Sequence, residues 1–503
     1  MRPPFLAKSS ASPPARAGFA CDGGGAVSRS SACECCGPAA RALNRRITAD
    51  LSRRAMLGGA AALLAPFIGL RPAKALSEPP PAPGRPILFS NLLLFDGLDG
   101  RLRQGVGVLA RGAKFAGLPP AGESVEGAQV IDCGGRLAMP GLIDAHWHAM
   151  LCGIRYAEAL TADVPYLHLV AASEAERTLL RGFTTVRDAG GPTFALKRAI
   201  DSGLIAGPRI FPSGAMVSQT AGHGDFRQRY EIPRGPQTPL SLTETAGVGV
   251  IADGEAEVLR RVREQLLLGA TQIKMMAGGG VSSHYDPIDV TQYSESELRA
   301  GVGAAEDWGT YVMTHVYTPR GIQRAIRAGV KSIEHGQLTD EESVRMMAGE
   351  GVWWSLQPFF SDEDSNPKVD PASRAKAEIV SQGTARAYEF SKQYKIKTAW
   401  GTDILFAPQN LPFHARHLAK LTPRFYEPLE LLGIATARNG ELLRLSGQRY
   451  PYDGDLGVIA PGAMADLLIV DGDPTKSLDF LVAPNETLRI VMKDGRIYKN
   501  TLG

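Results

Sequence analysis

The chain has 503 residues, of which 44% are hydrophobic and 21% are charged. This is the composition of a soluble globular protein large enough for one big domain and a smaller one. The formal charge of +3 comes from residues 1–75, where 11 Lys and Arg stand against three acidic residues. From residue 76 onward 44 basic residues face 49 acidic ones, and this mildly acidic balance gives no electrostatic case for a nucleic-acid partner.

Residues 52–75 have the pattern of a twin-arginine export signal. Arg53 and Arg54 precede an apolar run over residues 60–70, and Ala73-Lys74-Ala75 has the small residues of a cleavage site. The run is too short to span a bilayer easily, so membrane contact is expected only during export, with an uncleaved anchor as the alternative. We therefore expect a periplasmic or secreted bacterial protein, with a Pro-rich linker over residues 76–85.

Residues 1–51 are expected to be a disordered leader, because they are rich in Ser, Ala, Pro and Gly. The CECC stretch at 33–36 could bind a metal, but no matching Cys or His pair lies near it. After cleavage of the signal only Cys133 and Cys152 would remain, so no disulfide framework is expected.

Both ends of the remaining chain are rich in short β-prone pieces separated by turn signals. Residues 86–140 include ILFSNLLLFDG and GVGVLARGAKFAGL, and residues 452–503 include ADLLIVDGDP and RIVMKDG. We expect these two segments to form one small β domain.

Residues 141–451 alternate β-like apolar runs with helical patterns. One example is GLIDAHWH, then LHLVAASEAERTLLRG, then TTVRDAG; another is TQIKMMA, then ESELRAGVGAAEDWG, then TYVMTHV. Such alternation predicts repeated βα units on a parallel sheet, and several units over about 300 residues favour a closed (β/α)8 barrel. A doubly wound open sheet is the alternative, and periodicity does not exclude it.

The stretch GLIDAHWHAM places His146 and His148 two residues apart at the end of the first predicted strand. Side chains at i and i+2 of a strand point the same way, as two ligands of one metal must. Singly, a strand-end lysine, a core histidine or a capping aspartate is more often structural. Four further polar residues nevertheless end apolar runs just before loops, where barrel enzymes keep their active sites: Lys274, His315, His335 and Asp403. Together these six residues predict a metal site.

Several motifs resemble the amidohydrolase superfamily from about residue 86 to the end of the chain. PGLIDAHWH, KSIEHG and GTD look like its strand-one, strand-six and strand-eight motifs, and GVIAPGAMADLLIVDGDP looks like its C-terminal return. QIKMMAGGG is similar to the imidazolonepropionase-like and prolidase-like branch. The resemblance implies an α/β fold in which a (β/α)8 TIM-like barrel carries a small β-sandwich formed by both chain ends.

The resemblance also implies roles for the six residues. His146, His148 and Asp403 would bind a buried metal, His315 and His335 an outer one, and Lys274 would bridge both as a carbamate. Charge supports the bridge, since a lysine ammonium beside two cations should lose its proton and the neutral amine can take up CO₂. The alternative is a neutral lysine acting as a base at a one-metal site. Zinc suits this donor set, although cobalt or manganese could replace it.

The expected reaction is amide hydrolysis, in which Asp403 takes a proton from water and delivers it to the leaving amine. His223, in SQTAGHGDF, could donate a hydrogen bond to the carbonyl oxygen or could merely structure its loop. Tyr317 would face the same side as His315 and could bind a substrate carboxylate. Trp353, Trp354, Phe359 and Phe360 could line an apolar pocket or serve packing.

The leading hypothesis is an exported dinuclear amidohydrolase that cleaves the amide or peptide bond to a C-terminal amino acid. By the resemblance, its substrates would be Xaa-Pro or related dipeptides, N-acyl amino acids or aryl amides of phenylalanine such as ochratoxin. A mononuclear cyclic-amide hydrolase or deaminase is the alternative, and Lys274 argues against it. A non-catalytic scaffold is a third reading, but no ligand position is missing. Exposed aromatic loops would suit a homo-oligomer.

Overall fold

The computed structural model describes residues 84–502 except 232–234, 236–237, 367 and 369, and these residues belong to one compact unit. The predicted leader and export signal, and all of the linker before Gly84, lie outside the described residues. Within the described part, no helix has both the length and the apolar character that crossing a membrane requires.

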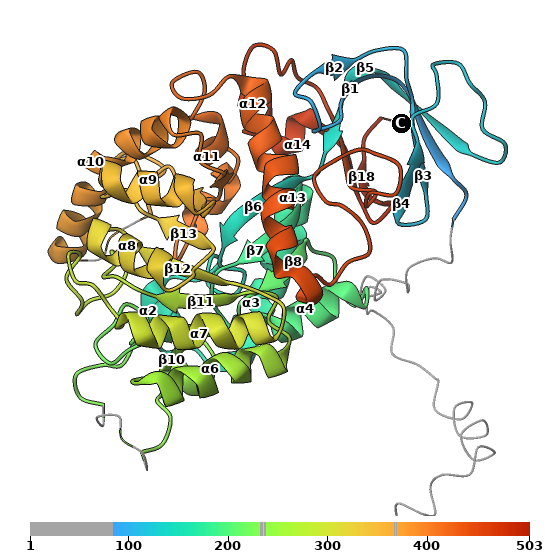
Figure 1. Cartoon of the computed structure of the whole chain (residues 1–503). Coiled ribbons are helices and arrows are strands. Elements are labelled where there is room, and N and C mark those ends of the chain that lie inside the picture. Colours follow the sequence, from blue (N-terminus) through green and yellow to red (C-terminus); the bar gives the residue numbers. More distant parts are fainter. Residues whose placement is uncertain (1–83, 232–234, 236–237, 367, 369, 503) are drawn as a thin grey trace, which may run out of the picture. The chain divides into compact units, whose positions relative to one another are not determined.

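A mostly antiparallel sheet joins the two ends of the described chain, as the β-prone pieces predicted. Strands from residues 87–140 and from residues 467–500 lie side by side in it, and β5 pairs with β1 on one edge and β16 on the other (Figure 1). The eight strands form one hydrogen-bonded sheet. They are β1 (Ile87–Phe95), β2 (Leu102–Arg103), β3 (Val108–Arg111), β4 (Lys114–Gly117), β5 (Gln129–Pro140), β16 (Leu467–Val470), β17 (Leu488–Lys493) and β18 (Arg496–Asn500).

The middle of the chain forms two parallel sheets with helices between most successive strands, so the α/β class with parallel strands is confirmed. One sheet has the order β6-β7-β8, and the other has the order β10-β9-β11-β12-β13-β14-β15. The strands are β6 (Leu142–Trp147), β7 (Phe183–Asp188), β8 (Arg209–Pro212), β9 (Met216–Ser218), β10 (Gly249–Ile251), β11 (Ile273–Met276), β12 (Val312–Val316), β13 (Ser332–His335), β14 (Trp353–Leu356) and β15 (Thr398–Trp400).

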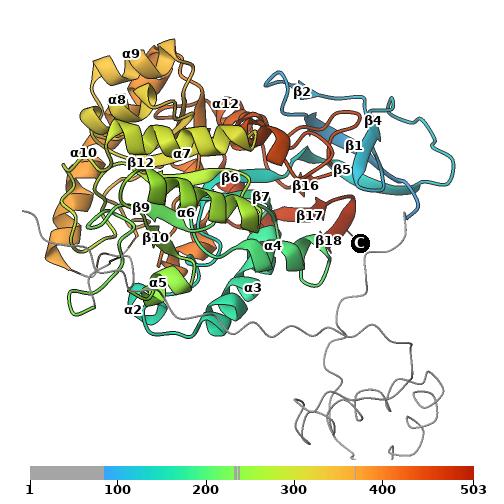
Figure 2. The same cartoon turned by 60° about the horizontal axis from the view of Figure 1, so that its bottom comes forward.

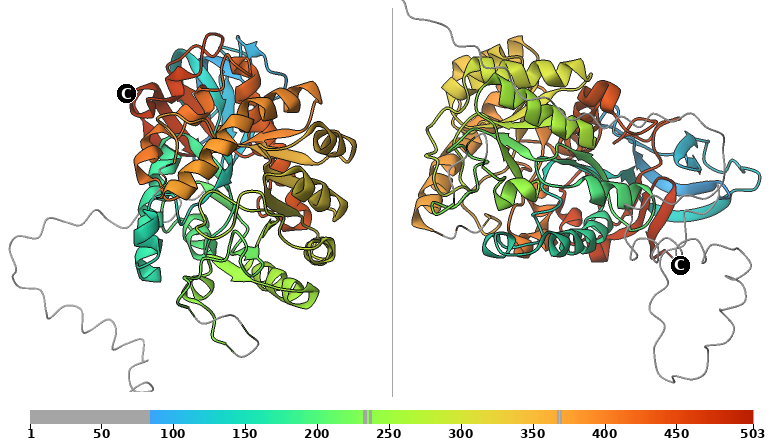
Figure 3. Two further views of the ribbon diagram at one scale, coloured as in Figure 1. Left: turned by 90° about the vertical axis from the view of Figure 1, so that its left-hand side faces the viewer. Right: turned by 90° about the horizontal axis from the view of Figure 1, so that it is seen from below.

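Helices α6 to α10 flank the parallel strands, on the part of the molecule away from the antiparallel sheet (Figures 2 and 3). Helix α7 begins with a capping box in which Ser294 and Glu297 satisfy each other's backbone amides. The α-helices are α2 (Tyr156–Ala159), α3 (Val164–Leu180), α4 (Phe194–Asp201), α5 (Leu242–Thr245), α6 (Glu255–Leu268), α7 (Glu295–Asp307), α8 (Pro319–Arg327), α9 (Glu341–Gly349), α10 (Pro371–Gln393), α11 (Arg416–Ala419), α12 (Pro428–Gly433), α13 (Asn439–Leu443) and α14 (Pro484–Thr487).

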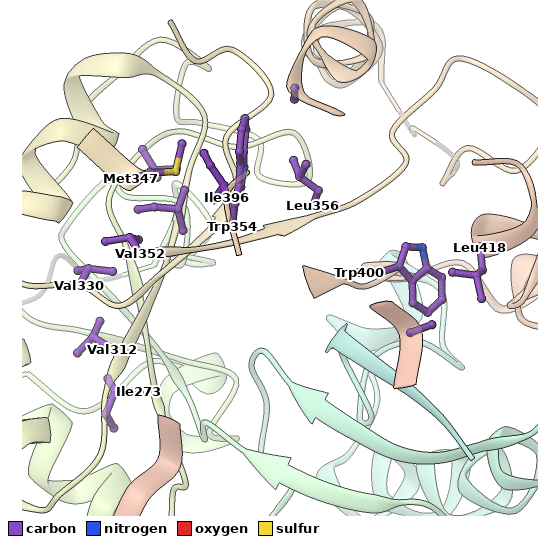
Figure 4. Close-up of a cluster of buried hydrophobic side chains, with 14 of the residues drawn as sticks. Ile273, Val312, Val330, Met347, Val352, Trp354, Leu356, Ile396, Trp400 and Leu418 are labelled. Carbon is purple, nitrogen blue, oxygen red and sulfur yellow. The ribbon is translucent and has the colours of Figure 1, made fainter. Parts of the chain in front are cut away.

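The main core lies between the parallel strands and their helices. Ile273 of β11, Val312 of β12 and Met347 of α9 belong to one buried cluster, which Trp354 of β14 also joins (Figure 4). Burying these apolar side chains is the main force that holds the helices against the strands.

Two backbone hydrogen bonds connect the two parallel sheets. Beyond β15, the amide of Asp403 donates to the carbonyl of His146 in β6 at 2.9 Å. The amide of Thr271, before β11, donates to the carbonyl of Pro212 in β8 at 2.8 Å. Polar residues at the ends of β6, β11, β12 and β13 are thereby brought close to Asp403.

Gly401 permits the first of these contacts. A β-carbon on Gly401 would lie 2.5 Å from the backbone nitrogen of His146. We expect Gly401→Ala to lower the free energy of unfolding by roughly 1–3 kcal/mol, because neither backbone can yield without strain. Urea denaturation measures the change. Gly303→Ala in α7 is the matched control, because open space surrounds that position and alanine there should be neutral or stabilising; equal stability of both variants would contradict close packing at Gly401.

Candidate active site

One cavity gathers the eight residues to which the sequence analysis assigned metal-binding, catalytic or substrate-binding roles. His146 lies in β6 and His148 follows that strand, while Lys274, His315 and His335 lie in β11, β12 and β13. Asp403, His223 and Tyr317 come from the segments after β15, β9 and β12. The structure therefore brings the predicted residues together, and their individual roles remain predictions.

Each of four histidines has one ring nitrogen engaged by an acceptor outside the cluster. Nδ1 of His146 is 2.6 Å from Glu334 Oε2, Nδ1 of His148 is 3.1 Å from the carbonyl of Gly190, and Nδ1 of His335 is 2.8 Å from Gln357 Oε1. His315 differs, because its Nε2 is 3.1 Å from the carbonyl of Gly279. When one nitrogen of a neutral imidazole donates a hydrogen bond, the second nitrogen keeps a free lone pair. That lone pair is what binds a metal ion.

The free nitrogens and the Asp403 carboxylate converge. Asp403 Oδ1 lies 3.2 Å from His148 Nε2 and 3.6 Å from His146 Nε2, and Lys274 Nζ lies 3.3 Å from His146 Nε2. Ligand atoms of His146, His335 and Asp403 all lie within 4.8 Å of one another. The ring of His315 stands 4.5 Å from that of His335 between centroids. These residues form a possible metal site of His and Asp ligands.

Burial sets the protonation of this cluster. It lowers the pKa of His335 to about 3 and holds that of His146 and His315 well below the usual range, so these three imidazoles are neutral near pH 7. Burial also lowers the pKa of Lys274 to about 8. Burial alone would raise the pKa of Asp403, but the nearby imidazoles outweigh it and keep this carboxylate ionised. Neutral imidazoles and an ionised carboxylate are the ligand forms that metal ions bind.

Sequence reasoning missed the buried ion pair behind the cluster. Glu334 accepts from His146 and pairs with the Arg187 guanidinium at 2.8 Å, and both side chains are fully buried. Arg187 also donates to the carbonyl of Ala145 at 2.6 Å. The available signal was a charged residue inside the apolar strand patterns SIEHG and TTVRDAG, since a buried charge needs a partner.

His223 is held by the segment that follows β11. Its Nδ1 lies 2.7 Å from Ser283 Oγ and 3.3 Å from Asp286 Oδ2, and its ring stacks on His315 with centroids 4.0 Å apart. Asp286 in turn accepts from the amide of Gly280 at 2.8 Å. Among the described residues Nε2 of His223 has no hydrogen-bond partner, so this nitrogen is available to a ligand in the cavity.

The aromatic residues of the Trp353–Phe360 stretch divide between packing and pocket. Trp353 and Trp354 are buried in β14, and Trp354 Nε1 donates to the carbonyl of His335 at 2.7 Å. Phe359 and Phe360 line the cavity. Tyr317 is also buried, with its ring edge-on to His315 and stacked on His335.

The rest of the cavity wall is mainly apolar. Its side chains include Leu151, Met216, Phe226, Met276, Val281, Phe359, Phe360, Leu405 and Phe406. An apolar wall with a few convergent polar groups is typical of a small-molecule site.

Parallel βα units with a cluster of His, Lys and Asp side chains at their strand ends are typical of hydrolases that bind metal ions. The sequence profile of the Amidohydrolase family matches residues 137–498, and the chain belongs to this family. Ochratoxinase of Aspergillus niger is 32% identical over 375 residues, which are 72% of this chain and 75% of that protein.

Two solved structures extend the comparison. An amidohydrolase is 39% identical with a TM-score of 0.75, and a prolidase complexed with N-methylphosphonate-L-proline is 34% identical with a TM-score of 0.74. Each match covers 83% of this chain and 100% of the other. The prediction of the amidohydrolase superfamily and its prolidase-like branch is confirmed, as is that of a hydrolase acting on amide bonds of small molecules. Dependence on metal ions is typical of the family.

Proposed function

We propose that the chain is a dinuclear metal-dependent amidohydrolase that cleaves the amide or peptide bond to a C-terminal amino acid. The observation that carries this proposal is the set of four histidines, each oriented by an outside acceptor, around Asp403 and Lys274 in one apolar-walled cavity.

The donor set fits two metal ions. His146, His148 and Asp403 would hold one ion and His315 and His335 the other, and the lone pairs left by the outside hydrogen bonds are those a metal requires. Lys274 would bridge the two as a carbamate. With a pKa of about 8, its amine is neutral in about one molecule in ten at pH 7, and that form adds to CO₂ with release of one proton. Zinc suits imidazole and carboxylate ligands best.

The residues of the chain divide the work of hydrolysis. Two bound ions would supply an acidified water and polarise the scissile carbonyl. The Asp403 carboxylate accepts the proton of the attacking water and passes it to the leaving amine. His223, whose Nδ1 can accept from the Ser283 hydroxyl at 2.7 Å, would donate from Nε2–H to the carbonyl oxygen. The apolar wall excludes water from the acyl or amine part of the substrate.

The substrate class follows from the wall and from the relatives. The names of two relatives, an ochratoxinase and a prolidase, point to amide bonds of phenylalanine or proline, and the aromatic wall suits such side chains. N-acyl amino acids, Xaa-Pro dipeptides and aryl amides of phenylalanine are therefore the candidates. Tyr317 is proposed to contact the substrate within the same cavity.

Three further properties belong to the same proposal. The two parallel sheets would close as a (β/α)8 barrel, and the hydrogen bonds from Asp403 and Thr271, which connect the two sheets, support this closure. The antiparallel sheet would form the β-sandwich, and the barrel and sandwich keep the predicted bounds of 141–451 and 86–140 with 452–503. Residues 52–75 would direct export of a homo-oligomer.

Metal content measured by mass spectrometry on the purified chain tests the proposal, together with amine release from a panel of the three candidate classes. We expect about two divalent ions per chain after preparation with zinc and bicarbonate, and hydrolysis of at least one class. Lys274→Met should lose bound metal, while the matched control Lys331→Met, an exposed lysine, should not. One ion or none in the wild-type chain would reopen the mononuclear alternative.

A further inference from the structure

Lys368 stands where two cavities of the molecule meet. It lines the cavity that contains the histidine cluster, and it also lines a neighbouring cavity with Arg155, Tyr156 and Gln409. Val281, Ser282, Leu405 and Phe406 form the rest of the shared boundary. A group attached to a substrate in the first cavity can therefore reach Lys368 without leaving the cleft.

Arg155 lines only the neighbouring cavity, and the other lysine and arginine side chains near the first cavity are already engaged. Lys376 donates to the carbonyls of Ser283 and Asp286 at 2.7 and 3.2 Å. Arg416 and Lys420 lie 3.1 and 2.7 Å from the Asp364 carboxylate. Lys274 lies within the histidine cluster. None of these cations is free to bind an additional anion.

The Lys368 ammonium has no hydrogen bond or ion pair within the described part of the chain. The side chain is half-buried, and burial lowers its pKa, although Asp403 acts in the opposite direction. An unpaired cation in a partly buried position is costly until an anion joins it. The lining of the first cavity thus offers one positive charge without a protein partner among the described residues.

We propose that Lys368 binds the free carboxylate of the substrate and so makes the enzyme selective for amides of amino acids whose carboxyl group is unblocked. This inference rests on the proposed function, because an amide bond to a C-terminal amino acid places a carboxylate a few bonds from the scissile carbonyl. A point charge on a flexible stem suits a carboxylate whose distance varies with the amino acid.

The test compares a free acid with its primary amide. The first compound is the free acid that the wild-type chain hydrolyses best. The second is the same compound with its C-terminal carboxyl group converted to a primary amide. For Lys368→Met we expect KM for the free acid to rise roughly 10- to 100-fold, as for a hydrogen bond to a charged group, with kcat within about twofold. KM for the primary amide should not change. Lys368→Arg should restore most of the affinity, and Lys331→Met is the control for loss of a lysine.

The outcomes separate the two proposals. If the wild-type chain hydrolyses no panel compound, the proposed function fails. If it hydrolyses a free acid, but Lys368→Met raises KM for acid and amide equally or for neither, only the role of Lys368 is overturned. If KM for the free acid rises selectively in Tyr317→Phe and does not rise in Lys368→Met, Tyr317 rather than Lys368 binds the substrate carboxylate. Unchanged metal content and melting temperature in Lys368→Met exclude a folding defect.

Discussion

Replacing Asp403 with Asn should lower kcat by about 10²–10⁴-fold, the range expected when a positioned proton carrier is lost. The amide keeps the size of the side chain and an oxygen to face His146 and His148, which lie 3.6 and 3.2 Å from Oδ1. It cannot accept a proton from water, and it lacks the negative charge that the surrounding imidazoles stabilise. Steady-state kinetics and metal content are measured on the same preparation.

The metal content decides what the loss means. If the variant keeps its metal but loses turnover, proton transfer by Asp403 is supported. If it loses both the metal and turnover, the main role of Asp403 is that of a metal ligand. Asp453→Asn is the matched control, since its side chain is 97% exposed and pairs with Lys114 far along the chain. Full activity of the Asp403 variant would refute the proposed mechanism.

Removal of Glu334 should be the most destabilising single change near the site. Glu334→Ala leaves the Arg187 guanidinium buried without its carboxylate partner, which costs about 3–5 kcal/mol of unfolding free energy. The same change frees Nδ1 of His146, so metal affinity should fall roughly 10- to 100-fold. Denaturant unfolding of the metal-free chain and zinc titration measure the two effects separately.

A double variant distinguishes stability from ligand orientation. Glu334→Leu with Arg187→Met removes both charges and should recover much of the stability, because a buried ion pair is often no better than apolar packing. It should not recover metal affinity, since nothing then orients His146. Glu363→Ala, at an 80% exposed carboxylate paired with Arg416, is the control and should cost less than about 1 kcal/mol. Metal affinity that returns with stability would contradict an orienting role.

The sequence allowed prediction of the alternation of elements and of the residues that meet in the cavity. His146, Lys274, His315 and His335 lie at or near the ends of parallel strands, and such ends meet at one edge whatever the exact register. Trp353 and Trp354 could not be placed, because two adjacent aromatic residues in a strand face opposite sides and either side could have been the cavity. The structure buries both.

The partners of the cluster could not be predicted for a different reason. Arg187 and Glu334 are 147 residues apart, and their pairing depends on how β7 and β13 are placed across the two sheets. The segment that holds His223 is similarly distant, with Asp286 more than 60 residues further on. Local periodicity carries no information about such contacts, so they emerge only when the strands are assembled.

The antiparallel sheet has a consequence for the order in which the chain can fold during synthesis. Strand β5 takes one of its two neighbours from β16, a strand that starts more than 300 residues later. On the ribosome this edge of β5 therefore stays open until nearly the whole chain has been translated, and an open strand edge can pair with another nascent chain. Completion of the fold is thus tied to release of the finished polypeptide, and a stop codon that removes β16 to β18 would leave the edge of β5 open for association between chains.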